Sequence, residues 1–226
     1  MPDFAEPLMV KYLHDKGARE GIPVSGTFEL TQRCNFSCEM CYVHDCKQKA
    51  DPLSAEDWLN LARQAKDAGT VFLLLTGGEP LIRDDFEKIY TTLAKMGFLI
   101  SINTNGSLLE KYAKLFEELP PTRINISLYG ANNEAYGRLC GNQAFDRVMS
   151  SVRCMQELGI AVKFNTVFTP QNISDYKKIA DISKEMGIQL KPTTYTYPSV
   201  RLDSGNKDSR FSPEAAADYI SLIDEY

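Results

Sequence analysis

The stretch Cys34-Asn35-Phe36-Ser37-Cys38-Glu39-Met40-Cys41 decides how the rest of this chain is interpreted. It carries three cysteines on one short loop, and it closely follows the strand-like segment 27–31. Three thiolates so arranged are able to bind three irons of a [4Fe–4S] cluster. The fourth iron then has no protein ligand from this loop, and an open iron binds a substrate or cofactor directly. The spacing therefore predicts chemistry as well as electron storage.

Two other ligand sets stay open for this loop. With His44, the cysteines would form a closed tetrahedral zinc site. With Cys46 as a fourth thiolate, the loop would hold a closed cluster that only carries electrons. Zinc modules usually pair two Cys-x-x-Cys knuckles, whereas this chain has a single tight triplet. We therefore expect the open cluster, with Cys34, Cys38 and Cys41 as its ligands.

The overall composition fits a single sizeable hydrophobic core. The chain has 226 residues, of which 43% are hydrophobic and 24% are charged, and its net charge is −5. An acidic balance argues against a nucleic-acid partner, since such binding depends on clustered Lys and Arg. The apolar runs are too short to span a bilayer, and the N-terminus lacks a signal core. Because three of the cysteines share one loop instead of forming a disulfide framework, we expect a cytoplasmic protein without a membrane partner.

A strand–helix unit repeats along the chain. Helical patterns end at Gly69, Gly97, Gly159 and Gly187, and a β-rich apolar run follows each at once. Glycine tolerates the left-handed turn that stops a helix, and continuous apolar runs are typical of strands buried on both faces. The expected strands are residues 25–30, 71–75, 98–103, 122–128, 161–168 and 188–195.

This alternation implies right-handed crossovers and a parallel sheet. Six units are fewer than the eight of a closed barrel. We therefore predict an α/β fold, an open partial (β/α)6 TIM-like barrel with parallel strands, whose reactive end lies at the C-terminal ends of the strands. Residues 1–23 are expected to form an N-terminal extension and residues 24–226 the core domain. The last amphipathic stretch has no cap, so we expect a core trimmed before any C-terminal auxiliary domain.

Polar motifs follow the expected strands. Thr76-Gly77-Gly78-Glu79-Pro80 comes after the second strand. Its two glycines let a ligand approach the backbone, and the carboxylate of Glu79 suits a ligand ammonium. Asn103 and Thr104 end the third strand, where a side chain is expected to point into the cavity. Each motif taken alone fits an ordinary turn equally well.

The later strands add three candidate ligand contacts. Ser127 ends the fourth strand and suits a sugar hydroxyl or a carboxylate. Arg138 follows it and is able to pair with a carboxylate through its planar fork. Asn165 lies inside the fifth strand, where a buried amide needs a partner. A buried serine, a surface arginine and an amide bonded to a neighbouring strand are the structural alternatives.

Together these motifs resemble those of the radical S-adenosylmethionine (radical SAM) superfamily. The resemblance covers roughly residues 24–200 and rests on Cys-x3-Cys-x2-Cys, Gly-Gly-Glu-Pro and Ser-Leu-x-Gly after the first, second and fourth strands. The segment from Ser127 to Asn172 most resembles the peptide- and protein-modifying branch, which includes SPASM-type maturases and anaerobic sulfatase-maturating enzymes.

The resemblance implies two cofactors, a [4Fe–4S] cluster on the three loop cysteines and S-adenosylmethionine on the open iron. It implies reductive cleavage to a 5′-deoxyadenosyl radical, which abstracts hydrogen from a peptide or protein substrate. An electron donor such as flavodoxin or ferredoxin is implied as a partner. A radical SAM enzyme of small-molecule cofactor biosynthesis and a non-enzymatic iron–sulfur or zinc protein are the alternatives.

The resemblance also implies which residues contact S-adenosylmethionine. They are Met40, Gly77, Gly78, Glu79, Thr104, Ser127, Arg138 and Asn165. Met40 stands where the family usually has an aromatic residue beside the adenine. No acid or base is assigned, because the radical step requires none. Cys140 is expected in a loop near the cavity, as a possible hydrogen-atom donor, and Cys154 on the inner stripe of a helix.

Overall fold

The computed structural model describes residues 8–43, 51–198 and 206–224. At its centre is a six-stranded parallel sheet in the order β1-β2-β3-β4-β5-β6. The strands are β1 (Ser25–Glu29), β2 (Phe72–Thr76), β3 (Leu99–Thr104), β4 (Arg123–Ser127), β5 (Val162–Val167) and β6 (Gln189–Thr193). Each strand begins and ends within two residues of its predicted bounds, so the predicted open α/β partial barrel is confirmed.

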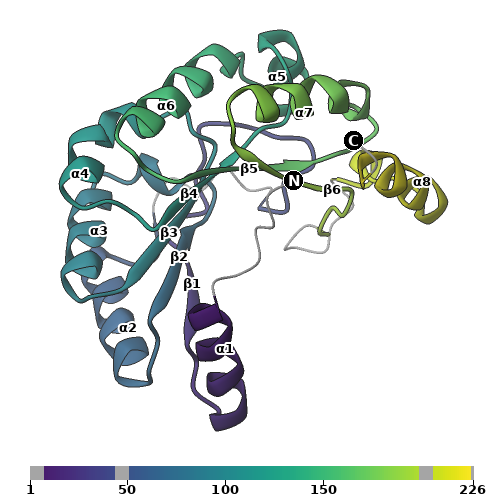
Figure 1. Ribbon diagram of the computed structural model, residues 1–226. Helices are drawn as coiled ribbons and strands as arrows, with labels where there is room; N and C mark the ends of the chain where they lie inside the picture. The colour runs from purple at the N-terminus through teal and green to yellow at the C-terminus, as the bar shows by residue number, and fades with distance from the viewer. Residues whose placement is uncertain (1–7, 44–50, 199–205, 225–226) are drawn as a thin grey trace.

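Helices α2 to α7 lie between the strands in the chain, α1 comes before β1 and α8 comes after β6. They are α1 (Leu8–Glu20), α2 (Ala55–Asp67), α3 (Phe86–Lys95), α4 (Ala113–Glu118), α5 (Asn133–Cys140), α6 (Phe145–Glu157), α7 (Tyr176–Glu185) and α8 (Pro213–Asp224). Short 3-10 turns are η1 (Pro80–Ile82), η2 (Leu109–Tyr112), η3 (Ile173–Asp175) and η4 (Lys207–Ser209). Figure 1 shows α2 to α7 along the outer, convex side of the curved sheet.

The two faces of the sheet differ in chemistry because side chains alternate along a strand. The face under the helices is apolar and buried, as at Ile102, Ile126 and Phe164, each with no exposed surface. The opposite, concave face carries their sequence neighbours, among them Asn103 and Asn165. The hydrophobic core therefore lies between sheet and helices, and polar side chains are left for the inside of the barrel.

Local signals explain where elements begin and end. Ser54 caps α2 with a complete capping box, in which its side chain and Asp57 exchange hydrogen bonds with each other's backbone N–H groups. Gly187 ends α7 with a φ of +63° and open space around it. Helix α1 was not predicted, and it packs Gly17 against Val24 beside β1.

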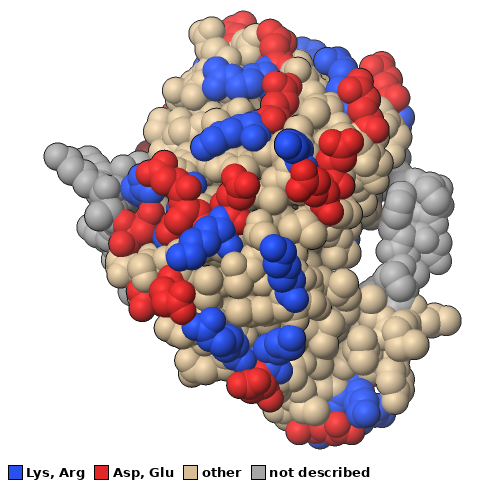
Figure 2. All heavy atoms as spheres, turned by 90° about the vertical axis from the view of Figure 1, so that its left-hand side faces the viewer, with Lys and Arg blue, Asp and Glu red and all other residues tan. Residues whose placement is uncertain are grey.

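Charged side chains of both signs are intermixed on the helical side of the molecule (Figure 2). On this face no large area carries a single sign of charge. A group of three basic residues on the sheet is described below.

Candidate active site

The cysteine loop leaves the C-terminal end of β1, at the edge of the sheet where the barrel was predicted to react. Cys34, Cys38 and Cys41 are half-buried free thiols. Met40 is buried in the hydrophobic core and is only 6% exposed. The backbone N–H of Cys41 donates to the carbonyl of Cys38 at 3.1 Å, which folds the last part of the loop into a turn.

The end of helix α5 holds the middle of the cysteine loop. The N–H of Ser37 donates to the carbonyl of Cys140 at 3.0 Å, and the N–H of Glu39 donates to the carbonyl of Leu139 at 3.0 Å. The thiol of Cys140 is fully buried and hydrogen-bonded to that of Cys38, a contact that, with burial, raises the pKa of Cys38. Cys140 was expected in a loop, but it is the last residue of α5.

The sulfur of Cys34 faces two N–H groups. The backbone N–H of Phe36 lies 3.4 Å from it and the amide nitrogen of Asn105 lies 3.9 Å away. Without a metal, burial raises the pKa of the Cys34 thiol to about 12. Asn105 also donates to Asn35 at 2.8 Å. Its contact with the loop was missed from the sequence, and its position in the Asn103-Thr104-Asn105-Gly106 turn was the only signal.

The Gly77–Gly78 turn packs directly on the chain that leads into the cysteines. A Cβ on Gly77 would lie 2.3 Å from the carbonyl oxygen of Thr31, and one on Gly78 would lie 2.2 Å from that of Arg33. The N–H of Gly78 donates to the Thr31 carbonyl at 2.7 Å. Glycine is thus required at both positions because the turn packs closely on the backbone of Thr31 and Arg33. Contact of the two glycines with a cofactor stays a prediction.

Glu79 is fully buried and joins the turns that follow β2 and β3. One carboxylate oxygen accepts from the N–H of Leu81 at 3.0 Å, the other from the N–H of Asn105 at 2.7 Å, and the hydroxyl of Thr104 bonds to both. Burial raises the pKa of Glu79 to about 7 although these hydrogen bonds oppose the shift. A ligand ammonium would reach this carboxylate only after one of these partners moves. Thr104, expected to face the cavity, is buried against Glu79 instead.

Two further predicted residues are neighbours in the sheet. Ser127 of β4 is directly opposite Asn165 of β5 in the strand register, on the concave face. Arg138 is not brought to them, because its exposed side chain pairs with Glu134 one turn earlier on α5 at 2.7 Å. Contacts of all three with a cofactor remain predictions.

Three cations gather on the concave face of β4, β5 and β6. Lys163 is half-buried between the exposed Arg123 and Lys191, and burial together with repulsion from both lowers its pKa. Among the described residues, none of the three is in an ion pair. We call Arg123, Lys163 and Lys191 the basic cluster. No carboxylate of the described segments forms an ion pair with it.

The cysteine loop fits a [4Fe–4S] cluster. Within residues 8–43, 51–198 and 206–224, no three His, Cys, Asp or Glu side chains converge closely enough to bind one metal ion. A cluster does not need such convergence, because each thiolate binds a different iron, and N–H groups facing the Cys34 sulfur suit a thiolate. The alternative fourth ligands, His44 and Cys46, lie outside the described residues.

Comparison with known proteins assigns the family. A family model described as the radical SAM superfamily matches residues 28–182 of the chain. This chain belongs to the radical SAM superfamily. The family implies a [4Fe–4S] cluster and S-adenosylmethionine as cofactors, and solved structures of similar fold contain bound S-adenosylmethionine.

Curated relatives of this radical SAM chain include probable GTP 3′,8-cyclases. That of Saccharolobus islandicus (strain M.14.25 / Kamchatka #1) is 34% identical over 161 residues, which cover 70% of this chain and 52% of the relative. That of Methanothermobacter thermautotrophicus is 38% identical over 152 residues, 66% of this chain and 50% of the relative. The chain thus spans about half the length of the curated relatives it matches.

Solved radical SAM structures share the fold. SuiB of Streptococcus suis bound to S-adenosylmethionine matches with a TM-score of 0.74 at 18% identity, over 99% of this chain and 55% of that one. The protein anSMEcpe with S-adenosylmethionine and the Cp18Cys peptide matches with a TM-score of 0.73 at 18% identity, over 89% and 59%. At these identities the likeness establishes the fold alone. No helix in the described part of the chain has the length and hydrophobicity to cross a bilayer.

Proposed function

We propose that this radical SAM chain holds its cluster through Cys34, Cys38 and Cys41 and acts on a small anionic substrate, with GTP as the first candidate. When bound, the cluster would pass one electron from an external donor to S-adenosylmethionine and so supply the radical chemistry that acts on the substrate. This ranks small-molecule chemistry above the peptide modification that the sequence motifs favoured, because the curated relatives named above act on GTP.

The basic cluster is the observation that carries the choice of substrate. Its three cations, which form no ion pair within the described part of the chain, offer charge-assisted hydrogen bonds to a phosphate or carboxylate group. Burial first, and then repulsion from Arg123 and Lys191, lowers the pKa of Lys163, and a bound anion would oppose this shift because an opposite charge favours the protonated amine. The amides of Asn103 and Asn125, bonded to each other at 2.8 Å on the same face, offer further polar contacts.

The remaining residues are proposed to orient S-adenosylmethionine. Ser127 and Asn165, opposite each other across β4 and β5, would bind its ribose and adenine. Arg138 would bind its carboxylate after releasing Glu134. The Gly77–Gly78 backbone would lie at its amino group. Reduced flavodoxin or ferredoxin is the proposed electron donor.

The test is anaerobic reconstitution with iron and sulfide, followed by addition of dithionite, S-adenosylmethionine and GTP. We expect 5′-deoxyadenosine by mass spectrometry, with a yield that rises when GTP is present. A Cys38→Ala variant should lose both the brown colour and the cleavage. A colourless wild-type protein that releases no 5′-deoxyadenosine would end the proposal of radical chemistry.

The substrate is tested separately with Lys163→Met and a matched Lys88→Met on the exposed surface of α3. Lys163→Met should keep its iron and S-adenosylmethionine binding but weaken GTP binding by about tenfold, the loss expected for one charge-assisted hydrogen bond. Lys88→Met should behave like the wild type. Equal GTP binding in all three proteins, or none in any, would exclude GTP at the basic cluster.

A peptide substrate remains the second candidate. Tyr195 and Tyr197 follow β6, are each 62% exposed, and their rings contact edge to face with centroids 4.8 Å apart. Exposed aromatic pairs are typical of surfaces that bind another polypeptide. A synthetic peptide library incubated with the reduced enzyme tests this. Peptides that change mass only when S-adenosylmethionine is present would support it, and an unchanged library would not.

A further inference from the structure

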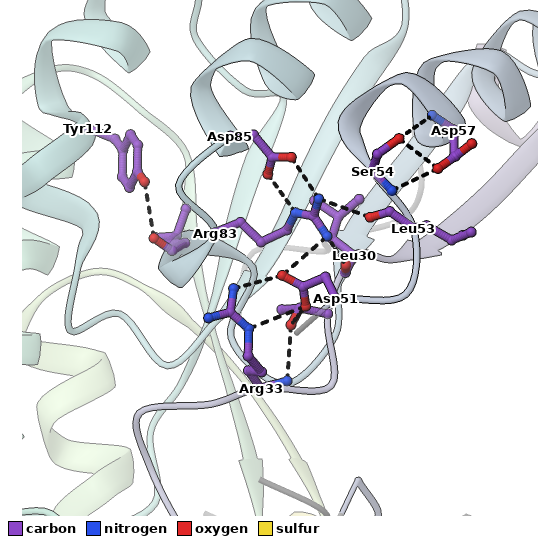
Figure 3. A network of polar contacts seen from close by, with 11 residues as sticks. Leu30, Arg33, Asp51, Leu53, Ser54, Asp57, Arg83, Asp85 and Tyr112 are labelled. Carbon is purple, nitrogen blue, oxygen red and sulfur yellow. Dashed lines mark hydrogen bonds and ion pairs between the residues drawn. The ribbon is translucent and has the colours of Figure 1, made fainter. Parts of the chain in front are cut away.

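Arg83 is a buried cation, and all three nitrogens of its guanidinium donate hydrogen bonds within the protein. The residue is 2% exposed and lies directly after η1. Its Nε and Nη2 donate to the two carboxylate oxygens of Asp85, each at 2.8 Å. Its Nη1 donates to the carbonyl of Leu30 at 2.7 Å, and its Nη2 also reaches the carbonyl of Leu53 at 3.2 Å. Figure 3 shows these contacts meeting at one guanidinium.

The two carbonyls that Arg83 binds bracket the cysteine segment. Leu30 comes just after β1 and Leu53 just before Ser54, the cap of α2. All three proposed cluster ligands lie between them in the chain. Arg83 therefore ties together the two ends of the segment that carries the cysteines, while it is itself attached to the turn after β2.

Asp51 extends the contacts to the residues next to the first cysteine. It pairs with Arg33 at 2.7 Å and with Arg83 at 3.5 Å, and it accepts a hydrogen bond from the hydroxyl of Thr31. Burial opposes ionisation of Asp51, but the hydrogen bonds from Arg33 and Thr31 outweigh it, and the pKa of the carboxyl lies below its usual value. The carboxylate is thus charged and held at neutral pH.

The same residues hold the glycine turn. The carbonyl of Thr31 accepts from Gly78 at 2.7 Å, and the carbonyl of Arg33 accepts from Glu79 at 2.9 Å. The backbone of residues 31–33 is thus fixed on one side by Asp51 and on the other side by the turn proposed to face S-adenosylmethionine. A shift of this backbone would move the cysteines and the glycine turn relative to each other.

Stability alone is a weak reason for such a network. Burying charged groups costs solvation free energy, and well-packed apolar residues often stabilise a protein as much. A planar guanidinium, in contrast, fixes several acceptors in defined directions at once. The arrangement therefore suits positioning better than it suits stabilisation.

We propose that Arg83 and Asp51 are positioning residues, which hold the cysteine segment against the Gly77–Gly78–Glu79 turn and so set where the cluster lies relative to S-adenosylmethionine. This inference rests on the proposed function. Neither residue is proposed to contact the cofactors. They act through the backbone of residues 31–33, whose carbonyls bind the turn.

The experiment compares Arg83→Lys, Asp51→Asn and the control Arg63→Lys. Arg63 pairs with Glu56 at 2.6 Å on exposed α2 and has no link to the cysteine segment. In the protein without a cluster, hydrogen exchange of the Gly78 and Glu79 N–H groups directly measures how firmly the glycine turn is bound to the backbone of residues 31–33. In the loaded protein, iron content, S-adenosylmethionine binding and the electron paramagnetic resonance spectrum of the reduced cluster are measured.

Asp51→Asn and Arg83→Lys should speed exchange at residues 77–79 and weaken S-adenosylmethionine binding by about tenfold, from the loss of charge-assisted hydrogen bonds. The spectral change on adding S-adenosylmethionine should be smaller per bound iron, while Arg63→Lys matches the wild type. A lower melting temperature with wild-type exchange, binding and spectra would overturn the proposal. If Arg83→Lys fails to fold, Asp51→Asn decides, because its side chain is part-exposed and the change nearly isosteric. A wild-type protein with no response to S-adenosylmethionine would refute the proposed function. The exchange result would still test whether Arg83 and Asp51 hold the cysteine segment against the glycine turn.

Discussion

Glu79 lies in the interior, where its carboxylate links two turns, and its contact with a ligand ammonium stays a prediction. It accepts hydrogen bonds from Thr104 and Asn105, at the end of β3 and directly after it, and from Leu81 in its own turn. They only partly offset the cost of burying a charge, so its pKa stays raised.

Substitution of Glu79 should change how stability depends on pH. The folded pKa is about 7 and the ordinary value is 4.5, so the folded protein binds this proton more tightly than the unfolded protein. The carboxyl therefore favours folding most below the lower value, and this contribution is lost as pH rises to about 7. The unfolding free energy of the wild type minus that of Glu79→Gln should fall over this window, by at most about 1.4 kcal/mol per pH unit. Urea denaturation of the cluster-free proteins measures it, and a flat difference would contradict a raised pKa.

At the scale of elements, the end of α5 is part of the cysteine site. Gly141 follows it with a φ of +64°, and a Cβ there would lie 2.1 Å from the hydroxyl of Ser37. Gly187 after α7 has nearly the same φ, +63°, but open space around it. Both glycines adopt a left-handed backbone conformation, but only Gly141 packs against the cysteine loop.

Alanine at the two glycines should separate these effects. Gly187→Ala should cost about 1 to 2 kcal/mol of unfolding free energy, from left-handed backbone alone. Gly141→Ala should cost more, and it alone should lower the iron bound after reconstitution, because Ser37 or the loop must move. Denaturant unfolding measures the free energy of unfolding of each variant, and an iron assay measures the iron bound after reconstitution. Equal losses of stability with full iron in both variants would show that α5 does not hold the loop.

At the scale of the whole molecule, loops after several strands meet at one end of the sheet. The cysteine loop, the glycine turn, the turn after β3 and the end of α5 are joined by hydrogen bonds. The helices α2 to α7 lie along the convex side of the sheet (Figure 1), and their buried apolar residues share one hydrophobic core with Phe36 and Met40 of the cysteine loop. A cluster bound by the three cysteines should therefore stabilise one end of the barrel selectively.

Hydrogen exchange with and without the reconstituted cluster tests this. Peptides that cover residues 30–43, 76–83, 104–107 and 139–142 should become protected, because the bound state stabilises what it contacts. The interiors of α3 and α6 should change little. Protection spread evenly over the molecule would instead indicate that the cluster drives folding of the whole chain.

Much of this could be predicted from the sequence because it depends on neighbours in the chain. Apolar runs after four helix-ending glycines located β2, β3, β5 and β6, and the alternation of all six strands with helices predicted a parallel open barrel. The spacing of Cys34, Cys38 and Cys41, together with Gly-Gly-Glu-Pro and Ser-Leu-x-Gly, carried the resemblance to the radical SAM superfamily. Each of these signals lies within a few consecutive residues.

Only the tertiary structure decided which side chains meet. Arg138 turned out to pair with Glu134 on the surface, and Thr104 was found under Glu79. The contacts of Cys140 with Cys38 and of Arg83 with both ends of the cysteine segment join residues far apart in the chain. Residue types and spacing do not reveal such contacts. The contacts form only when the strands align and their loops meet at one edge of the sheet.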